Sequence, residues 1–86
     1  MIEVIYKRLR ENYSCTLNSK KNSIEIYIGS GYFLILTHKV QKNMNIFKIA
    51  SNRGSKSVII PCSIDENGHS DIMPLYCFID DFSSLL

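Results

Sequence analysis

The residues that could do chemistry are few in this 86-residue sequence: two histidines, three cysteines and eight carboxylates. Catalysis by a cysteine nucleophile needs a thiolate beside a histidine base, with a third group that orients the base. Cys62 and His69, with Asp65 or Asp71, are the one set that could fill these roles, and their spacing does not specify the arrangement. A core cysteine beside an exposed turn histidine explains the same residues better.

Metal binding would draw on the cysteines and histidines together. Zinc sites usually take two ligands from a short knuckle or from a helical i,i+4 pair. The closest pair here, Cys62 and His69, is seven residues apart across an expected turn. We therefore expect no metal and no other cofactor.

General acid–base cleavage of RNA is the strongest enzymatic hypothesis. It needs a basic surface and one His, Glu or Tyr as the proton-transfer group. The residues that could share such a sheet face are His38, Glu25, Tyr27, Lys39, Lys48 and Arg53. The short length, basic N-terminal half and expected opening helix are loosely similar to small bacterial toxin ribonucleases. No motif of that family is present, and the acidic C-terminal part does not suit RNA.

Charge is distributed unevenly along the chain. All ten Lys and Arg residues lie at or before Lys56, against three acids, which gives +7 for this part. From Ser57 onward there are five acids and no Lys or Arg, which gives −5 and a total of +2. If the fold keeps the two parts separate, the molecule has one positive and one negative surface. If their strands pair in one sheet, the charges neutralise each other instead.

A small domain with uneven charge and no catalytic motif suits protein binding, for which about 800 Å² per partner suffices. The expected partner-binding residues are Asp65, Glu66, Asp71, Tyr76, Asp80 and Asp81. Such a surface could cap a basic, nucleic-acid-cleaving active site. The sequence thus predicts a non-enzymatic inhibitor with one protein partner, first of all an immunity protein that neutralises a bacterial toxin such as a nuclease. A phage-encoded inhibitor of a host defence complex, of the anti-CRISPR kind, is the alternative.

Nucleic-acid binding without catalysis is a further alternative. It needs basic residues interleaved with exposed aromatic rings. The candidate residues are Arg8, Arg10, Lys20, Lys21 and Arg53. The pI of about 8.5 is low for a strongly basic domain, and a solvated helix face explains the helical arginines equally well.

Length and hydropathy predict one globular domain over residues 1–86. The longest apolar run, Tyr32 to Leu36, is far below the roughly 20 residues of a membrane-spanning helix. The N-terminus carries an early acid and no secretory pattern, so we expect a cytoplasmic protein that does not enter a membrane.

The expected elements begin with a helix over residues 1–13, because Ile2, Ile5, Leu9 and Tyr13 form one helical stripe. Strands follow in the segments 24–28, 32–37, 46–49 and 58–60, with an extra strand near 15–17 as an option. Gly29-Ser30-Gly31 predicts a tight hairpin. The run 32–37 is apolar on both faces, which is typical of a central strand covered on each side. Pro61 places the last of these strands at an edge or ends it.

The C-terminal segment fits two structures. Leu75, Phe78, Ile79 and Phe82 match a helical stripe, whereas the aromatic run after Pro74 matches a strand. The favoured interpretation is a strand to Ile79 and then a short helix capped by Asp80. The fold class is therefore α+β: an N-terminal helix packed on an antiparallel meander of about four to six strands, with a short C-terminal helix as an option.

Overall fold

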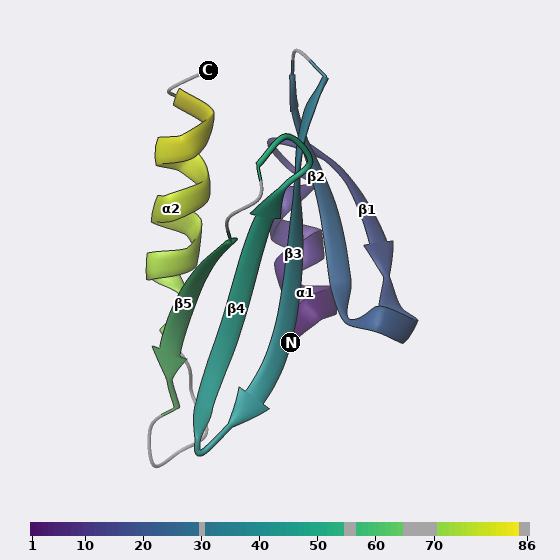
Figure 1. The fold of residues 1–86 in the computed structure, drawn as a ribbon. Coiled ribbons are helices and arrows are strands. Elements are labelled where there is room, and N and C mark those ends of the chain that lie inside the picture. Colours follow the sequence, from purple (N-terminus) through teal and green to yellow (C-terminus); the bar gives the residue numbers. More distant parts are fainter. Residues whose placement is uncertain (30, 55–56, 65–70, 85–86) are drawn as a thin grey trace.

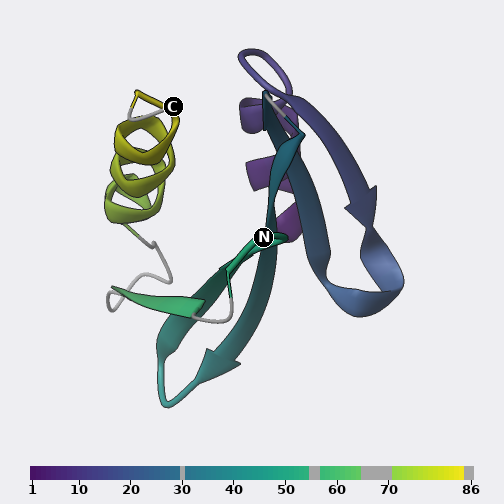
Figure 2. The same cartoon turned by 45° about the horizontal axis from the view of Figure 1, so that its top comes forward.

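The computed structural model describes residues 1–29, 31–54, 57–64 and 71–84. Five strands form one antiparallel sheet in sequence order, and both α-helices lie against the same side of it (Figures 1 and 2). In chain order the elements are α1 (Ile2–Leu9), β1 (Ser14–Asn18), the 3₁₀ turn η1 (Ser19–Lys21), β2 (Ser23–Gly29), β3 (Tyr32–Gln41), β4 (Met44–Ser51), β5 (Ser57–Ser63) and α2 (Met73–Ser84). The predicted α+β fold with an N-terminal helix and an antiparallel meander is confirmed.

Helix α1 presents Ile2, Ile5 and Leu9 to the core, as its stripe predicts. Glu3 lies in the first turn and Lys7 and Arg8 in the last, which suits the helix dipole. The helix ends at Leu9, four residues earlier than expected. The backbone N–H of Tyr13 still donates to the Leu9 carbonyl at 2.9 Å, so one further turn leads the chain into β1.

The strands alternate between two environments along their length. The side chains that point toward the helices are almost completely buried, and they form the core together with the helical residues. From the sheet this core takes Ile24, Ile26, Leu34, Leu36, Phe47, Ile49, Ile60 and Cys62. Because successive strand residues face opposite ways, the intervening positions all lie on the other face of the sheet.

Residues with positive φ form the β2–β3 and β3–β4 hairpins. Gly29 and Gly31 have φ of 104° and 73°, and they flank the predicted turn between β2 and β3. A tight turn connects β3 to β4. Lys42 and Asn43 alone make it, with φ of 50° and 61°. Two consecutive residues in the left-handed region suit the right-handed twist of the paired strands, so both strands extend to the turn.

The edges of the sheet are β1 and β5. Strand β1 corresponds to the optional strand near 15–17, and it pairs with β2 from Ser14↔Tyr27 to Asn18↔Ser23. Pro61 lies within β5 rather than at its end. The missing N–H of a proline is tolerated there because β5 has a partner strand on one side only.

The C-terminal segment is a helix from Met73 to Ser84, which corrects the favoured strand to Ile79. The buried residues Leu75, Tyr76 and Ile79 form one helical face. The Asp71 carboxylate accepts a hydrogen bond from the backbone N–H of Met73 at 3.1 Å and so satisfies a donor at the helix start. Asp80 therefore lies inside the helix and does not cap it.

The central strand β3 is covered on one side only, contrary to expectation. Its core-facing residues Leu34 and Leu36 lie beneath the helices, whereas Phe33 and Ile35 point the other way. Neither α1 nor α2 covers that second face (Figures 1 and 2). The apolar residues on the far side of β3 thus belong to a surface of the described structure.

This architecture predicts losses of stability of different size at two neighbouring residues of β3. Leu36→Ala should lower the free energy of unfolding by about 2–5 kcal/mol because it leaves a cavity under the helices. Ile35→Ala should cost no more than about 1 kcal/mol because its side chain lies on the uncovered face. Urea unfolding of both variants measures the difference. Equal losses would show that both faces are covered in solution.

Candidate binding surface

The uncovered face of the sheet is the candidate functional surface, and we call it the open face. It consists of the strand positions that point away from the helices. These are Ser14, Thr16 and Asn18 of β1, Ser23, Glu25 and Tyr27 of β2, Phe33, Ile35, Thr37, Lys39 and Gln41 of β3, Met44, Ile46, Lys48 and Ala50 of β4, and Ser57, Ile59, Pro61 and Ser63 of β5.

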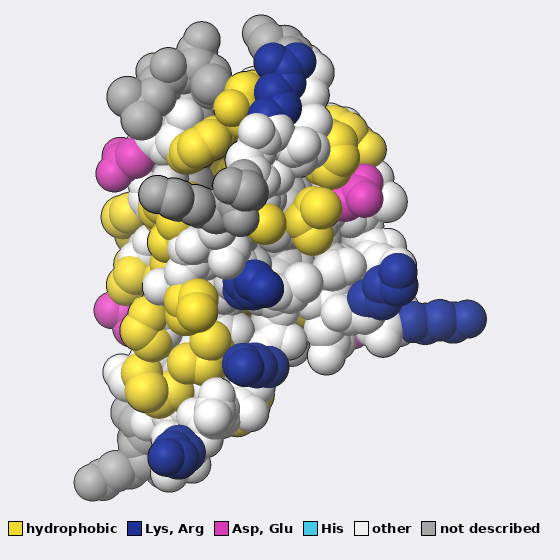
Figure 3. All heavy atoms as spheres, viewed as in Figure 1, with side chains coloured by type: hydrophobic (Ala, Val, Ile, Leu, Met, Phe, Trp, Pro, Cys, Tyr) yellow, Lys and Arg dark blue, Asp and Glu magenta, His cyan; other side chains and the backbone are white. Residues whose placement is uncertain are grey.

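The strand register places lysines and apolar side chains side by side on the open face. Lys39 is opposite Ile46, and Lys48 lies between Thr37 on one side and Ile59 on the other. Figure 3 looks onto this face: hydrophobic side chains gather over β4 and β5, and Lys and Arg side chains stand among and beside them. In this view the acidic side chains lie toward the margins. The β4–β5 part of the open face is therefore both apolar and positive.

An aromatic group occupies the other end of the open face, near the β2–β3 hairpin. The rings of Tyr27 and Phe33 are opposite each other with centroids 5.5 Å apart. The Arg53 guanidinium lies 5.0 Å from the centroid of the Tyr32 ring. Such an arginine–aromatic contact holds the turn between β4 and β5 against the β2–β3 hairpin.

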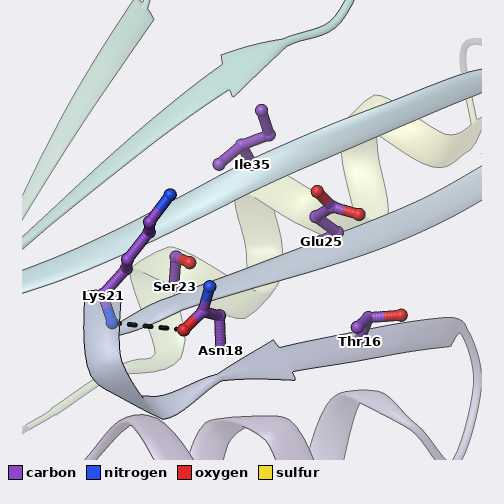
Figure 4. A pocket seen from close by; sticks show the side chains of 6 residues that line it. All are labelled: Thr16, Asn18, Lys21, Ser23, Glu25 and Ile35. Carbon is purple, nitrogen blue, oxygen red and sulfur yellow. Dashed lines mark hydrogen bonds between the residues drawn. The ribbon is translucent and has the colours of Figure 1, made fainter.

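A larger and a smaller hollow lie on the described part of the open face. The larger has a volume of about 270 Å³ and is lined by Thr16, Asn18, Lys21, Ser23, Glu25 and Ile35. Figure 4 shows Lys21 and Glu25 at opposite ends of it with Ser23 between them. The Asn18 side chain accepts a hydrogen bond from the backbone N–H of Lys21 and so fixes η1. The smaller hollow, about 180 Å³, is lined by Thr37, His38, Lys39, Ile46 and Lys48.

Glu25 and Tyr27 interact with each other. The Tyr27 hydroxyl donates to Glu25 Oε2 at 3.1 Å. This hydrogen bond, followed by the negative charge of Glu25, raises the pKa of the Tyr27 phenol above its ordinary value. A raised pKa makes Tyr27 a poorer proton donor, so the pair does not match the needs of general acid catalysis at neutral pH.

The residues proposed for a ribonuclease face are only partly brought together. Glu25, Tyr27, Lys39 and Lys48 share the open face. His38 points toward the covered face, where its Nε2 lies 2.8 Å from Asn45 Oδ1 and its ring 5.0 Å from that of Phe47. Asn45 is itself buried, so this histidine has a structural partner and lies apart from the proposed proton-transfer groups.

The cysteine chemistry considered from the sequence also lacks support. Cys62 is buried, and its pKa is raised first by burial and then by the charge of Asp71. A thiol with a raised pKa is a weak nucleophile at neutral pH. His69 and Asp65 lie outside the described residues. Within the described part of the chain, no group of three His, Cys, Asp or Glu side chains is placed to hold a metal ion.

Of the six residues expected to bind a partner, the structure describes Asp71, Tyr76, Asp80 and Asp81. Asp65 and Glu66 lie outside the described residues. Asp71 caps α2. Tyr76 is only 8% exposed, so little of its side chain reaches the surface. Asp80 accepts a hydrogen bond from the Tyr13 hydroxyl at 2.6 Å, and Asp81, which follows it on α2, is exposed.

The five basic residues of the nucleic-acid alternative are spread over separate elements. Arg8 on α1 lies 4.6 Å from the Tyr76 ring centroid, and Arg10 lies 5.8 Å from that of Tyr6. Lys20 and Lys21 belong to η1, whereas Arg53 stacks on Tyr32 in the turn after β4. The structure thus brings Lys21 to the rim of the open face and leaves the helical arginines on the opposite side of the sheet.

Sequence reasoning missed the apolar members of the open face, chiefly Phe33, Ile46 and Ile59. It named Lys39 and Lys48, but only as part of a catalytic face. A signal was present in the sequence. Apolar residues of β3 and β4 occur at both odd and even positions, so either the odd or the even set had to face away from a single covering layer.

The fold and this surface define a small α+β domain with an uncovered sheet face. No known protein family matches the chain, and neither curated proteins nor solved structures match it significantly. Among the described residues, neither helix is long and apolar enough to cross a membrane.

The contact between Glu25 and Tyr27 gives a pH-dependent prediction. Glu25→Gln removes the negative charge that raises the Tyr27 pKa, so the pKa should fall toward the ordinary value of about 10. The ultraviolet absorbance of the phenolate, corrected with a Tyr27→Phe variant, follows this titration. Glu3→Gln on α1 is the control and should change nothing. An unchanged Tyr27 midpoint in Glu25→Gln would mean that the pair does not form in solution.

Proposed function

We propose that this chain is a non-enzymatic inhibitor that binds one protein partner through the open face. One observation carries the proposal: both helices cover the same face of the sheet, and the other face presents apolar side chains to solvent. Ile59 is 62% exposed in the middle of β5, and Tyr27 is 44% exposed on β2. Contiguous exposed apolar groups on a soluble domain mark an interaction surface.

The titratable groups support binding over catalysis. His38 and Cys62 point toward the covered face, and Glu25 and Tyr27 bond to each other. The open face offers instead what protein interfaces use: aromatic and aliphatic side chains at the centre, with charged groups beside them. An inhibitor needs only such a complementary surface.

Two biological forms fit this activity: immunity against a bacterial toxin, and phage inhibition of a host defence complex. Both act in the cytoplasm of the cell that contains the target. The acidic cap expected from the sequence suits these forms less well than the open face does. Asp71 and Asp80 already bond within the chain, and Tyr76 is buried.

Single-stranded nucleic acid is the second candidate for the open face. The contact between Tyr27 and Phe33 favours it, because bases stack on exposed aromatic rings. Lys21, Lys39 and Lys48 would supply the charge for the phosphates.

A pair of surface substitutions tests the proposed function. Ile59→Asp places a charge in the open face, whereas Val4→Asp places one on α1, and the two side chains are 62% and 61% exposed. Tagged wild-type and variant proteins are used for affinity purification from the native host, with each lysate split into nuclease-treated and untreated halves. We expect wild type and Val4→Asp to recover the same single protein at near-equal stoichiometry in both halves. Ile59→Asp should lose it, because a buried unpaired carboxylate costs several kcal/mol.

Circular dichroism of both variants checks that they remain folded. Recovery that disappears with nuclease would replace the proposal with nucleic-acid binding. If Val4→Asp loses the partner and Ile59→Asp retains it, the partner binds the helices and not the open face.

A further inference from the structure

Lys39, Ile46 and Lys48 form one compact group on the open face. Lys39 is directly opposite Ile46 in the register, and Lys48 follows Ile46 by two residues on the same side of β4. All three line the smaller hollow of about 180 Å³. Ile59 extends the group onto β5, opposite Lys48. An apolar depression thus has a lysine on either side of it.

Within the paired strands that the structure describes, neither lysine has an acidic neighbour. The open-face residues that flank Lys48 are Thr37 and Ile59 across the strands, and Ile46 and Ala50 along β4. Glu25, the acid of the open face, lies on β2, two strands from β4 and roughly 10 Å away by strand spacing alone. Lys39 and Lys48 are themselves diagonal neighbours, an arrangement of like charges that an incoming anion would stabilise.

We infer that the β4 side of the open face docks on an acidic protein surface. Partner carboxylates would pair with Lys39 and Lys48, and an apolar partner side chain would enter the depression over Ile46 and contact Ile59. This inference rests on the proposed function and specifies the partner's chemistry. The charge of this surface is opposite in sign to that of the acidic cap expected from the sequence. The acidic cap would bind a basic partner.

The position of the aromatic rings favours a protein over a nucleic acid at this group. Lys39 is six residues from Phe33 along β3, a distance of roughly 20 Å in an extended strand. A strand of nucleic acid needs phosphate contacts beside the rings on which its bases stack. Here the side chains beside the lysines are aliphatic: Ile46 and Ile59 would face a charged sugar–phosphate backbone without a partner for their apolar surface.

Charge reversal tests the inference with a matched control. Lys39→Glu/Lys48→Glu reverses the open-face pair, and Lys7→Glu/Arg10→Glu makes the same change in net charge on α1, behind the sheet. The protein recovered by wild type in the nuclease-treated half is purified and titrated with all three proteins. A single-stranded oligothymidylate of about 15 nucleotides is titrated in parallel.

We expect the open-face reversal to lower the affinity for the recovered protein at least about tenfold, mainly through slower association. The affinity of the α1 control should stay within about twofold of wild type. Wild-type binding should weaken between about 0.05 M and about 0.5 M salt, with a smaller dependence in the reversed variant. Changing an interface Glu or Asp of the recovered protein to Lys should restore binding to Lys39→Glu/Lys48→Glu.

The other outcomes separate the two proposals. If the open-face reversal binds the recovered protein as tightly as wild type, the acidic-partner inference is wrong and the inhibitor function stands. If the oligothymidylate binds wild type and loses affinity on reversal, and no protein survives nuclease treatment, nucleic acid is the occupant and both proposals fall. If wild type recovers no protein and does not bind the oligothymidylate, both proposals also fall.

Discussion

Every feature of this molecule depends on how five short strands bury their apolar side chains. The residues Ile24, Ile26, Leu34, Leu36 and Phe47 project from one face and need a covering layer. Helix α1 lies over the β1–β2 side of that face and α2 over the β5 side, and their buried stripes meet the same core. Because both helices are used on one face, none is left for the other. The open face is thus a direct consequence of the way the core is closed.

Closing the core in this way also decides where the reactive groups lie. His38 and Cys62 are at core-facing positions and are held by Asn45 and by the apolar interior. The polar side chains between the helices are engaged with each other: Tyr13 bonds to Asp80, and Arg8 lies over Tyr76. What the sheet presents to solvent on its open side is a set of lysines, aliphatic groups and aromatic rings, which can bind but lack an obvious proton-transfer pair among the described residues.

The parts of the fold that follow from local pattern could be predicted. The alternation of Ile24, Ile26 and Ile28 and the glycines around residue 30 locate β2 and its hairpin without tertiary information. The segment after Pro74 could not be assigned in the same way, since its apolar residues fit both the helical and the strand period. Helix α2 forms because Leu75, Tyr76 and Ile79 are buried in the core along one face of the helix. Asp71 also accepts a hydrogen bond from a backbone N–H of its first turn. Asp71 is visible in the local sequence, but the core that the helix packs against is not.

The same limit applies to what the charge pattern along the sequence says about the surface. A block of acids near the C-terminus suggests an acidic patch, yet charge that is segregated along a chain need not be segregated in space. Asp71 bonds to the first turn of α2 and Asp80 to Tyr13. Lys39 and Lys48, 9 residues apart in the chain, become neighbours through the β3–β4 register. The positive charge on the β4 side of the open face is therefore set by strand pairing.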